Sequence, residues 1–315
     1  MISPIVSIVI CTRNRAESLK LTLQSIAACE TTADLPVEVL VVDNGSTDHT
    51  PRVVVETKLP NICLRYFRQS VGAKTAACNR ALREADGDIF LFTDDDVRLP
   101  TRWIDGMCRP IADNQADAIA GGVVFPHDLD IRAKINRSWL AATEEIEPQK
   151  PQRFVGANMA FSRSVLSRVP EFDNELGPGA LGFGEETLFC MQLIRAGFRV
   201  QSRFDVAAEH HFDPSRLTRR GMIDMAKKMG RSEAYISYHW RHVEFSWPLS
   251  HELAKLRVLW GGRLREFSRC YLARETPFWE LERIQAAAFR NQYRREQRRP
   301  RLYDKLGLIK TSKAA

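Results

Sequence analysis

The stretch Ile89-Phe90-Leu91-Phe92-Thr93-Asp94-Asp95-Asp96 decides how the sequence is interpreted, because an apolar run ends abruptly in three consecutive carboxylates. A short apolar run bounded by polar residues is typical of a buried strand that ends at the edge of a sheet. Three adjacent aspartates cannot all be buried there without partners. Hard divalent cations prefer oxygen ligands, and Mg²⁺ often takes one or two carboxylates together with substrate phosphate oxygens. The triplet therefore predicts a metal site, with a solvated acidic turn as the alternative.

Two further apolar runs end in polar residues in the same manner. Residues 6–11 are followed by the polar stretch 12–15, and residues 37–42 by Asp43-Asn44-Gly45-Ser46. Strands separated by helices indicate a mostly parallel sheet with helices on both faces, and ligands bind such sheets at the carboxyl ends of the strands. We therefore expect the three polar ends to converge on one edge. The carboxylate of Asp43 can contact a nucleobase or ribose there, or it can serve as a turn or helix-cap residue.

The remaining pattern alternates helix and strand signals and becomes helical beyond Thr218. The predicted elements are helices at 17–28, 73–85, 162–168 and 185–196, strands at 154–161 and 198–207, and a Gly/Pro-rich loop at 171–184.

Two pairs of candidate functional residues lie in this second half. Glu185 and Glu186 open a helix, where the helix dipole favours carboxylates. A carboxylate at a loop–helix junction is also suited to general-base catalysis. His210 and His211 follow the last strand, where adjacent side chains point to opposite faces, so at most one of them would face a metal site.

Several segments between residues 5 and 220, which include the strand ends and the residue pairs described above, resemble the family 2 glycosyltransferases in their order and spacing. The resemblance implies an α/β fold of the GT-A type, a Rossmann-like nucleotide-diphospho-sugar transferase fold. Its mostly parallel central sheet is flanked by helices, and here a C-terminal helical extension follows. The segments that carry the resemblance are VSIVICTRNR, EVLVVDNGSTDHT, VGAKTAACNRALREADGDIFLFTDDDV, VGANMAFSRSVL, GFGEETLFCMQLIRAGFRV and AEHHFDPSRLT.

By this resemblance Asp43 recognises the base, Asp94 contacts the ribose or the metal, and Asp96 coordinates Mn²⁺ or Mg²⁺ at the donor diphosphate. Negative charge that builds on the leaving group would be stabilised there. Glu186 is the first choice for the catalytic base and Glu185 the second, in a direct displacement with inversion. The expected donor-binding residues are Thr12, Arg13, Asn14, Arg15, Asp43, Ser46, Lys74, Asn79, Asp94, Asp95, Gly156 and Asn158. The expected metal ligands are Asp94, Asp96, His210 and His211, with His210 favoured over His211.

The sequence departs from the family pattern at Cys78, where many relatives have an arginine next to the asparagine that matches Asn79. We expect Lys74 to supply positive charge instead. Glu186 stands where the family usually has an aspartate, which extends its reach by one methylene and leaves Glu185 as an alternative base.

Charge and patterning also divide the chain. From residue 290 onward there are nine basic and two acidic residues, which gives this tail a net charge of +7, the same as that of the whole chain. We expect a catalytic domain at 1–217, a helical extension at 218–290 and a flexible basic tail at 291–315. Apolar residues recur every three or four positions from Leu249 to Tyr271, with basic residues among them. This pattern predicts a helix that lies on an anionic membrane surface or packs on the catalytic domain.

The expected function is metal-dependent transfer of a sugar from a nucleotide-diphosphate donor, UDP first, to a hydroxyl of a saccharide, lipid-linked or other acceptor. We expect a role in bacterial cell-surface polysaccharide or glycoconjugate synthesis. The alternatives are a sugar nucleotidyltransferase and a non-catalytic binding module; nucleic acid is not expected as a partner, because the basic tail has no reading motif. Seven cysteines without CxxC spacing, no apolar run long enough to span a membrane and no signal peptide favour a cytoplasmic location, peripheral at the inner face of the membrane.

Overall fold

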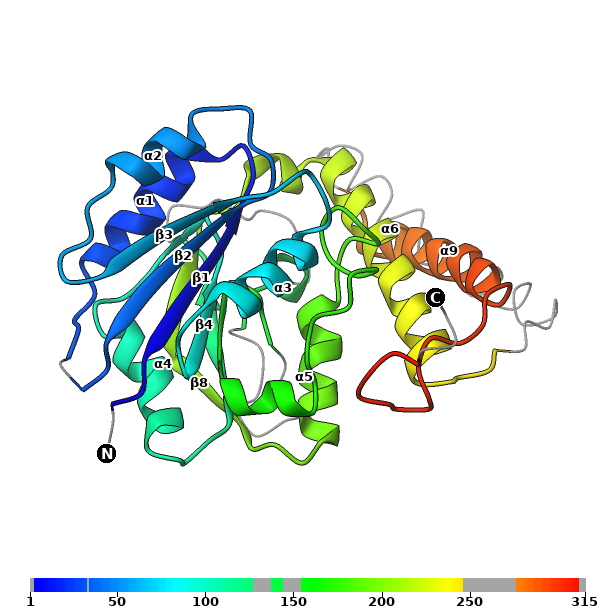
Figure 1. Cartoon of the computed structure of the whole chain (residues 1–315). Coiled ribbons are helices and arrows are strands. Elements are labelled where there is room, and N and C mark those ends of the chain that lie inside the picture. Colours follow the sequence, from blue (N-terminus) through cyan, green and yellow to red (C-terminus); the bar gives the residue numbers. More distant parts are fainter. Residues whose placement is uncertain (1–2, 33, 127–136, 144–153, 246–275, 312–315) are drawn as a thin grey trace. The chain divides into compact units, whose positions relative to one another are not determined.

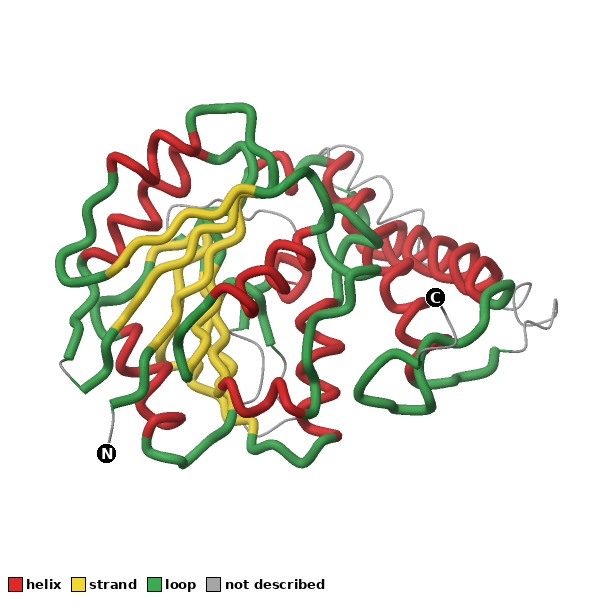
Figure 2. The backbone as a smooth tube through the Cα atoms, viewed as in Figure 1, coloured by secondary structure: helices red, strands yellow, loops and turns green. Residues whose placement is uncertain are grey.

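The computed structural model describes residues 3–32, 34–126, 137–143, 154–245 and 276–311. The chain divides into two compact units. The N-terminal unit consists of residues 1–129 and 136–212, and the C-terminal unit of residues 130–135 and 213–315. Figure 1 shows the strands of the N-terminal unit as one sheet with helices on either side, and Figure 2 shows the same backbone by secondary structure.

The sheet of the N-terminal unit has the strand order β3-β2-β1-β4-β7-β6-β8-β5. The pairs β1–β2, β2–β3, β1–β4 and β6–β8 are parallel, whereas β7 is antiparallel to β4 and β6, and β5 is antiparallel to β8. The strands are β1 (Val6–Thr12), β2 (Val37–Asp43), β3 (Cys63–Arg68), β4 (Ile89–Thr93), β5 (Val97–Arg98), β6 (Ala118–Val124), β7 (Asn158–Ser162) and β8 (Val200–His210). The helices are α1 (Ala16–Ala27), α2 (Thr50–Glu56), α3 (Lys74–Glu84), α4 (Trp103–Ala112), η1 (Arg137–Leu140), η2 (Arg163–Ser167) and α5 (Glu185–Arg195).

Strands β1 and β4 are buried along their whole length, which explains their largely apolar sequences. A parallel strand that is covered on both faces has no solvent-facing side, so it does not alternate apolar and polar residues. On one side Ile8 and Ile10 of β1 pack with Leu19 of α1 and Trp103 of α4. The sheet is therefore held between two apolar layers, and its carboxyl edge is the part left for polar side chains.

The opposite face of the sheet is covered by an aromatic cluster. The ring centroid of Phe172 lies 4.5 Å from that of Phe189 and 5.5 Å from that of Phe92. Phe161 contacts Phe90, Phe92 and Phe189 at centroid distances of 5.1–5.5 Å. Aromatic side chains bury large areas and prefer tilted or edge contacts of this kind. The cluster fixes α5 on this face and so determines where Glu185 begins that helix.

The predicted helices at 17–28, 73–85 and 185–196 are confirmed to within one residue at each end. The expected helix at 162–168 is the 3₁₀ helix η2, and the last two predicted strands are shifted to β7 and β8. The sequence did not predict β3 or β6. β3 is only partly buried and carries two arginines, and β6 contains two glycines, so neither shows a continuous apolar run.

The C-terminal unit is built on two helices, α6 (Arg219–Tyr235) and α9 (Phe278–Glu296). A 3₁₀ helix, η3 (Pro214–Leu217), precedes α6, and a π-helical turn, η4 (Ile236–Trp240), continues α6 at its C-terminal end. The helices approach so closely that a Cβ atom added to Gly230 would lie 2.2 Å from the carbonyl oxygen of Gln285. His239 is fully buried, with Nε2 3.1 Å from Glu296 Oε2 and Nδ1 accepting a hydrogen bond from the amide of Leu302.

This arrangement differs from the domain boundaries expected from the sequence. The expected boundary at residue 290 falls inside α9, and residues 297–311 include the buried side chains of Leu302 and Tyr303. The amphipathic pattern from Leu249 to Tyr271 lies outside the described residues. Among the helices that are described, none is long and apolar enough to cross a membrane.

Candidate active site

The structure brings the three predicted polar strand ends together at the carboxyl edge of the sheet. Thr12 is paired with Asp43 across β1 and β2, and Ile10 is paired with Thr93 across β1 and β4. The hydroxyl of Thr12 donates a hydrogen bond of 2.7 Å to Asp95 Oδ2, which joins the end of β1 to the acidic triplet. The expectation that these ends converge is therefore confirmed.

Each aspartate of the triplet has a different partner. Asp94 forms an ion pair with Lys74 of α3, and Asp96 forms one with Arg15 in the loop after β1. Asp95 Oδ1 lies 3.1 Å from Arg15 Nη1. Asp95 and Asp96 are buried, whereas the side chain of Asp94 is partly exposed. The three carboxylates are thus presented differently, and two cations lie among them.

Burial and neighbouring charge act in opposite directions on these carboxylates. Burial raises the pKa of Asp95 to about 6, although the charge of Arg15 and the hydrogen bond from Thr12 oppose the shift. For Asp96 the effect of burial is outweighed by His210 and Arg15, so its pKa lies well below the usual range. A carboxylate that stays ionised while buried is suited to holding a cation.

Of the two histidines, His210 is the one that faces the triplet. Its Nε2 lies 3.4 Å from Asp96 Oδ1, and its side chain is only 3% exposed. Its Nδ1 lies 3.2 Å from the carbonyl oxygen of Leu140, which accepts the Nδ1 proton in the tautomer that leaves Nε2 free. His211 instead pairs with Glu209 at 2.6 Å, as expected from the alternation of side chains along an extended segment.

These donors agree with a site for Mn²⁺ or Mg²⁺ that is completed by a diphosphate. A buried carboxylate and an adjacent imidazole nitrogen, with Asp94 nearby in sequence, supply few protein ligands and leave room for substrate oxygens. Within the described residues, no group of three or more His, Cys, Asp or Glu side chains is arranged to hold a metal ion by itself. The donor set therefore fits a metal that arrives with its substrate better than a closed structural site.

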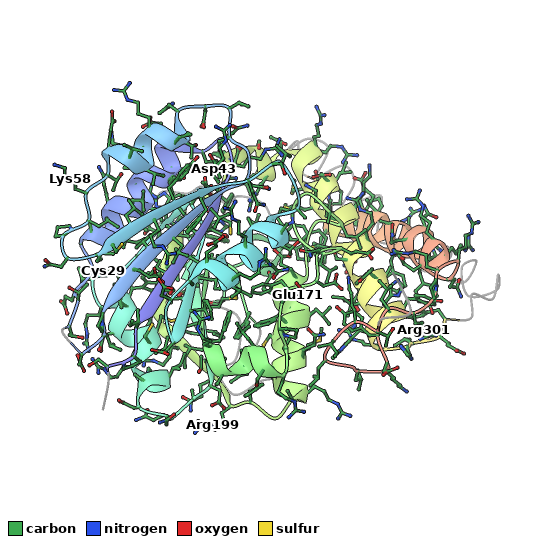
Figure 3. The ribbon with its side chains drawn as sticks, in the orientation of Figure 1. Cys29, Asp43, Lys58, Glu171, Arg199 and Arg301 are labelled. Carbon is green, nitrogen blue, oxygen red and sulfur yellow. The ribbon has the colours of Figure 1, made fainter. Side chains whose placement is uncertain are left out.

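Asp43, labelled in Figure 3, stands at the end of β2. Its side chain is fully buried. Its Oδ1 accepts a hydrogen bond of 2.7 Å from the amide of Ser46, and its Oδ2 accepts one of 2.6 Å from the hydroxyl of Tyr66. Burial, reinforced by Asp43, raises the pKa of Tyr66. Tyr66 was not predicted as a site residue, because β3 was not recognised as a strand of the sheet.

The loop after β1 is tied to the loop after β2. The backbone of Asn14 has a positive φ of 53°, and its amide donates a 2.9 Å hydrogen bond to the hydroxyl of Ser46. The side-chain oxygen of Asn14 accepts a hydrogen bond of 2.7 Å from the amide of Thr47. Arg13 is exposed. Asn14 and Ser46 therefore shape the two loops, while Arg13 remains accessible to a ligand.

Two of the expected donor-binding residues, Asn79 and Asn158, are used inside the protein. Both are buried. Asn79 exchanges two hydrogen bonds of 2.8 Å with the backbone of Phe172. Asn158 accepts a 2.9 Å hydrogen bond from Trp103 Nε1 and donates two, each of 2.8 Å, to the backbone. In contrast to the expectation, both side chains have structural partners that occupy their amide groups.

A small pocket lies beside the triplet, between β4, α3 and the start of α5. It is lined by Lys74 of α3, Asp94 after β4, Gly156 before β7, and Glu185 and Glu186 of α5. The remaining lining residues are Cys11, Cys78, Phe92, Thr93, Met159 and Phe172. The structure thus places Asp94, the first residue of the triplet, and the two glutamates around one pocket, although about 90 residues separate them in the sequence.

The two glutamates differ in exposure. Glu185 is 9% exposed, and burial raises its pKa well above the ordinary value, with a further contribution from the charge of Glu186. Glu186 is only partly buried. In each residue one carboxylate oxygen, Oε2, is buried without a hydrogen-bond partner among the described residues. Gly184, with a φ of 94°, supplies the left-handed turn from which this helix starts.

The sequence matches a known protein family and is similar to several known proteins. The family described as Glycosyl transferase family 2 matches residues 7–169, just over half of the chain. The chain is 29% identical over 216 residues to Glycosyltransferase AglE of Haloferax volcanii, covering 67% of this chain and 68% of that protein. It is 30% identical over 171 residues to Validoxylamine A glucosyltransferase of Streptomyces hygroscopicus subsp. jinggangensis, covering 54% of this chain but only 39% of that protein.

Solved structures show the same fold. The mannosyltransferase PcManGT from Pyrobaculum calidifontis, in complex with GDP-Man and Mn²⁺, superposes with a TM-score of 0.62 at 21% identity, over 92% of this chain and 87% of that one. Glucosyl-3-phosphoglycerate synthase from Mycobacterium tuberculosis, in complex with Mn²⁺, UDP and glucosyl-3-phosphoglycerate, gives 0.53 at 18% identity, over 75% and 79%. These similarities confirm the expected GT-A fold.

Proposed function

The chain belongs to glycosyl transferase family 2 and is a glycosyltransferase, and from this membership we propose that it is a metal-dependent, inverting enzyme with a nucleotide-diphosphate sugar donor. The acceptor is a hydroxyl group of a saccharide, a lipid-linked sugar or a related molecule. Membership of this family argues against the two alternative functions, a sugar nucleotidyltransferase and a non-catalytic binding module.

The observation that carries the metal dependence is the buried contact between Asp96 and His210 at the end of β4. Asp96 and His210 would hold Mn²⁺ or Mg²⁺, with Asp94 as a further ligand. A metal bound there stabilises negative charge on the leaving diphosphate. Asp95, whose two carboxylate oxygens accept hydrogen bonds from Thr12 and Arg15, positions the loop.

The acceptor hydroxyl needs a base, and the environment of the two glutamates supports Glu186. Burial, together with the charge of Glu186, raises the pKa of Glu185 well above its ordinary value and so favours its protonated form, which makes Glu185 the poorer candidate for accepting a proton. Glu186 lines the same pocket and is more exposed. In this proposal Glu186 takes the proton of the acceptor hydroxyl as the hydroxyl attacks the anomeric carbon, while Glu185 holds its neighbour in place.

For the donor we propose UDP, with uracil bound near Asp43 and Tyr66. Both carboxylate oxygens of Asp43 already accept hydrogen bonds, so a base must share an oxygen with the Tyr66 hydroxyl or replace it. Thermal shift with UDP, GDP and ADP, each with and without Mn²⁺, tests the nucleotide and the metal together. At a ligand concentration of 100 Kd, binding stabilises a protein by about 2.7 kcal/mol. If no nucleoside diphosphate raises the melting temperature with Mn²⁺, the proposal is wrong.

The two glutamates provide a matched pair of variants for the catalytic step. Glutamine resembles a protonated carboxyl, so Glu185→Gln should retain most of the transfer activity. Glu186→Gln should lower kcat by about 10²–10⁴-fold, the usual contribution of a general base. Both variants should bind UDP with Mn²⁺ like the wild type. Loss of transfer in Glu185→Gln, with activity retained in Glu186→Gln, would reverse the assignment.

We also propose peripheral contact with an anionic membrane at its inner, cytoplasmic face, which suits a lipid-linked acceptor and a role in bacterial cell-surface polysaccharide or glycoconjugate synthesis. The support is the net charge of +7 from residue 290 onward and the exposed arginines Arg283, Arg294 and Arg298 on and after α9. Basic residues near an anionic surface each contribute about 1 kcal/mol. The protein should sediment with vesicles that contain phosphatidylglycerol at low salt, and not with phosphatidylcholine alone; equal recovery in the supernatant with both contradicts the proposal.

A further inference from the structure

The carboxylates of the acidic triplet are already paired with cations of the protein itself. Arg15 lies against Asp95 and Asp96, and Lys74 lies against Asp94. These are the carboxylates that, on the proposed function, serve the metal and the donor. Any cation that binds Asp94 and Asp96 must therefore compete with an ammonium and a guanidinium group for the carboxylate oxygens of these residues.

The two cations enter the site from helix starts on the carboxyl edge of the sheet. Arg15 immediately precedes α1, and Lys74 is the first residue of α3. The side chain of Arg15 is 33% exposed and that of Lys74 is 25% exposed, whereas that of Asp96 is 4% exposed. The carboxylate is thus fixed by burial, while the cations lie on long side chains that reach the solvent-accessible side of the site.

The ion pairs of Arg15 and Lys74 compensate the negative charge of the aspartates. Buried carboxylates without partners are costly, and removal of one partner from a buried pair leaves an uncompensated charge. Like charges within about 4 Å repel strongly in a partly buried site. A divalent cation that enters alone would therefore meet two positive groups and would add two positive charges. A nucleoside diphosphate carries negative charge that offsets this addition.

We propose that Arg15 and Lys74 are exchangeable counter-ions, which release Asp96 and Asp94 to the metal and then bind the diphosphate. This inference rests on the proposed function, because it uses the same metal and donor. Arginine is well suited to the second role, since its planar group matches phosphate oxygens in pairs. Lysine serves as a point charge for phosphate. Metal and nucleotide are then each held weakly alone and strongly together.

The test measures metal binding without catalysis. Free Mn²⁺ is followed by electron paramagnetic resonance during titration of the full-length protein, with and without UDP. In Arg15→Met and Lys74→Met, Mn²⁺ alone should bind at least about tenfold more tightly than in the wild type, because a competing cation is gone. The same variants should bind UDP in the presence of Mn²⁺ about tenfold more weakly, since a phosphate contact is lost.

Controls separate this inference from general damage. Lys20→Met removes an exposed cation from α1 and should leave both affinities unchanged. Arg15→Lys keeps the positive charge, so its affinity for Mn²⁺ alone should stay near that of the wild type while its UDP affinity falls. Circular dichroism and the melting temperature show whether each variant is folded. If Arg15→Met does not fold, Lys74→Met and Arg15→Lys still decide the question.

The outcomes for the two proposals differ. If the wild type does not bind UDP, GDP or ADP with Mn²⁺, the proposed function is wrong. If the wild type binds metal and nucleotide together, but the methionine variants bind Mn²⁺ alone no more tightly than it does, the exchange of counter-ions is overturned and the proposed function stands. An unchanged affinity for UDP in both Arg15→Met and Lys74→Met would also overturn the exchange of counter-ions.

Discussion

Replacement of Asn158 by aspartate distinguishes a structural role for this residue from a role in donor binding. Its side chain is fully buried at the start of β7 and links three elements. It accepts a hydrogen bond from Trp103 on α4, and it donates to the carbonyl oxygens of Gly122 on β6 and Val206 on β8. A Cβ atom on Gly121 would lie 2.3 Å from Asn158 Cγ, so the neighbouring glycine leaves the space that this amide fills.

The cost of Asn158→Asp follows from these contacts. Even a protonated aspartate has one proton for two carbonyl oxygens, so one acceptor loses its donor, at about 1–3 kcal/mol. Ionisation adds a buried charge that faces two carbonyl oxygens, so the folded-state pKa is raised above the unfolded value of about 3.9. The variant is therefore least destabilised below about pH 4. Between the unfolded-state and the folded-state pKa of this aspartate, each further pH unit lowers the free energy of unfolding by about 1.36 kcal/mol.

Urea unfolding at pH 5 and pH 7 measures this effect. The destabilisation of Asn158→Asp should grow by about 2.7 kcal/mol between the two pH values, which is two pH units at 1.36 kcal/mol each. Asn61→Asp makes the same chemical change at an exposed position with a φ of 58°, which aspartate tolerates, and should show little growth. If Asn158→Asp is as stable as the control at both pH values but loses UDP binding, Asn158 is a donor contact and the structural interpretation fails.

Two further predictions concern stability. The pKa of Glu38 is lowered because hydrogen bonds from Ser7, Arg65 and the backbone outweigh the effect of burial. The stabilisation by its carboxylate is therefore present above the unfolded pKa of about 4.3 and is lost as the pH falls below that value. In thermal melts from pH 6 to pH 3, the Glu38→Gln variant should lose less stability than the wild type, and parallel curves would contradict this. Gly230→Ala places a Cβ atom 2.2 Å from the carbonyl oxygen of Gln285, so α6 and α9 must separate at a cost of about 1–3 kcal/mol, and an unchanged urea midpoint would show that the contact yields freely.

The sequence predicted the parts of the fold whose signal is local. Strands β1, β2 and β4 are largely apolar runs, interrupted only by Ser7 in β1 and Glu38 in β2, and each ends in polar residues that the parallel register brings to one edge. The edge strand β3 and the glycine-containing β6 carry no such run, and their pairing depends on partners far along the chain. Local periodicity is informative where burial is complete and fails where a strand is half exposed.

The candidate site was predicted in its residue types more than in its contacts. The ion pairs of Arg15 with Asp96 and of Lys74 with Asp94 join residues 81 and 20 positions apart. The sequence could not reveal whether a polar side chain faces a ligand or the protein, because Asn79 and Asn158 have the same amide group in either role. Burial and the identity of the hydrogen-bond partner decide this, and both are properties of the fold.

Lys74 lies close to Cys78, the position at which the resemblance to the family implied an arginine. Residues four apart on a helix lie on the same face, so Lys74 and Cys78 of α3 are neighbours, and both line the pocket. The thiol of Cys78 lies 3.5 Å from the sulfur of Cys11, and this contact together with burial raises its pKa, so it carries no charge at neutral pH. Lys74 pairs with Asp94, and its charge also opposes the rise in the pKa of Glu185. One lysine therefore adjoins both the carboxylate proposed for the leaving group and the glutamate beside the proposed base. We therefore propose that Lys74, one turn earlier on α3, supplies the positive charge that an arginine at position 78 would otherwise bring to the donor site.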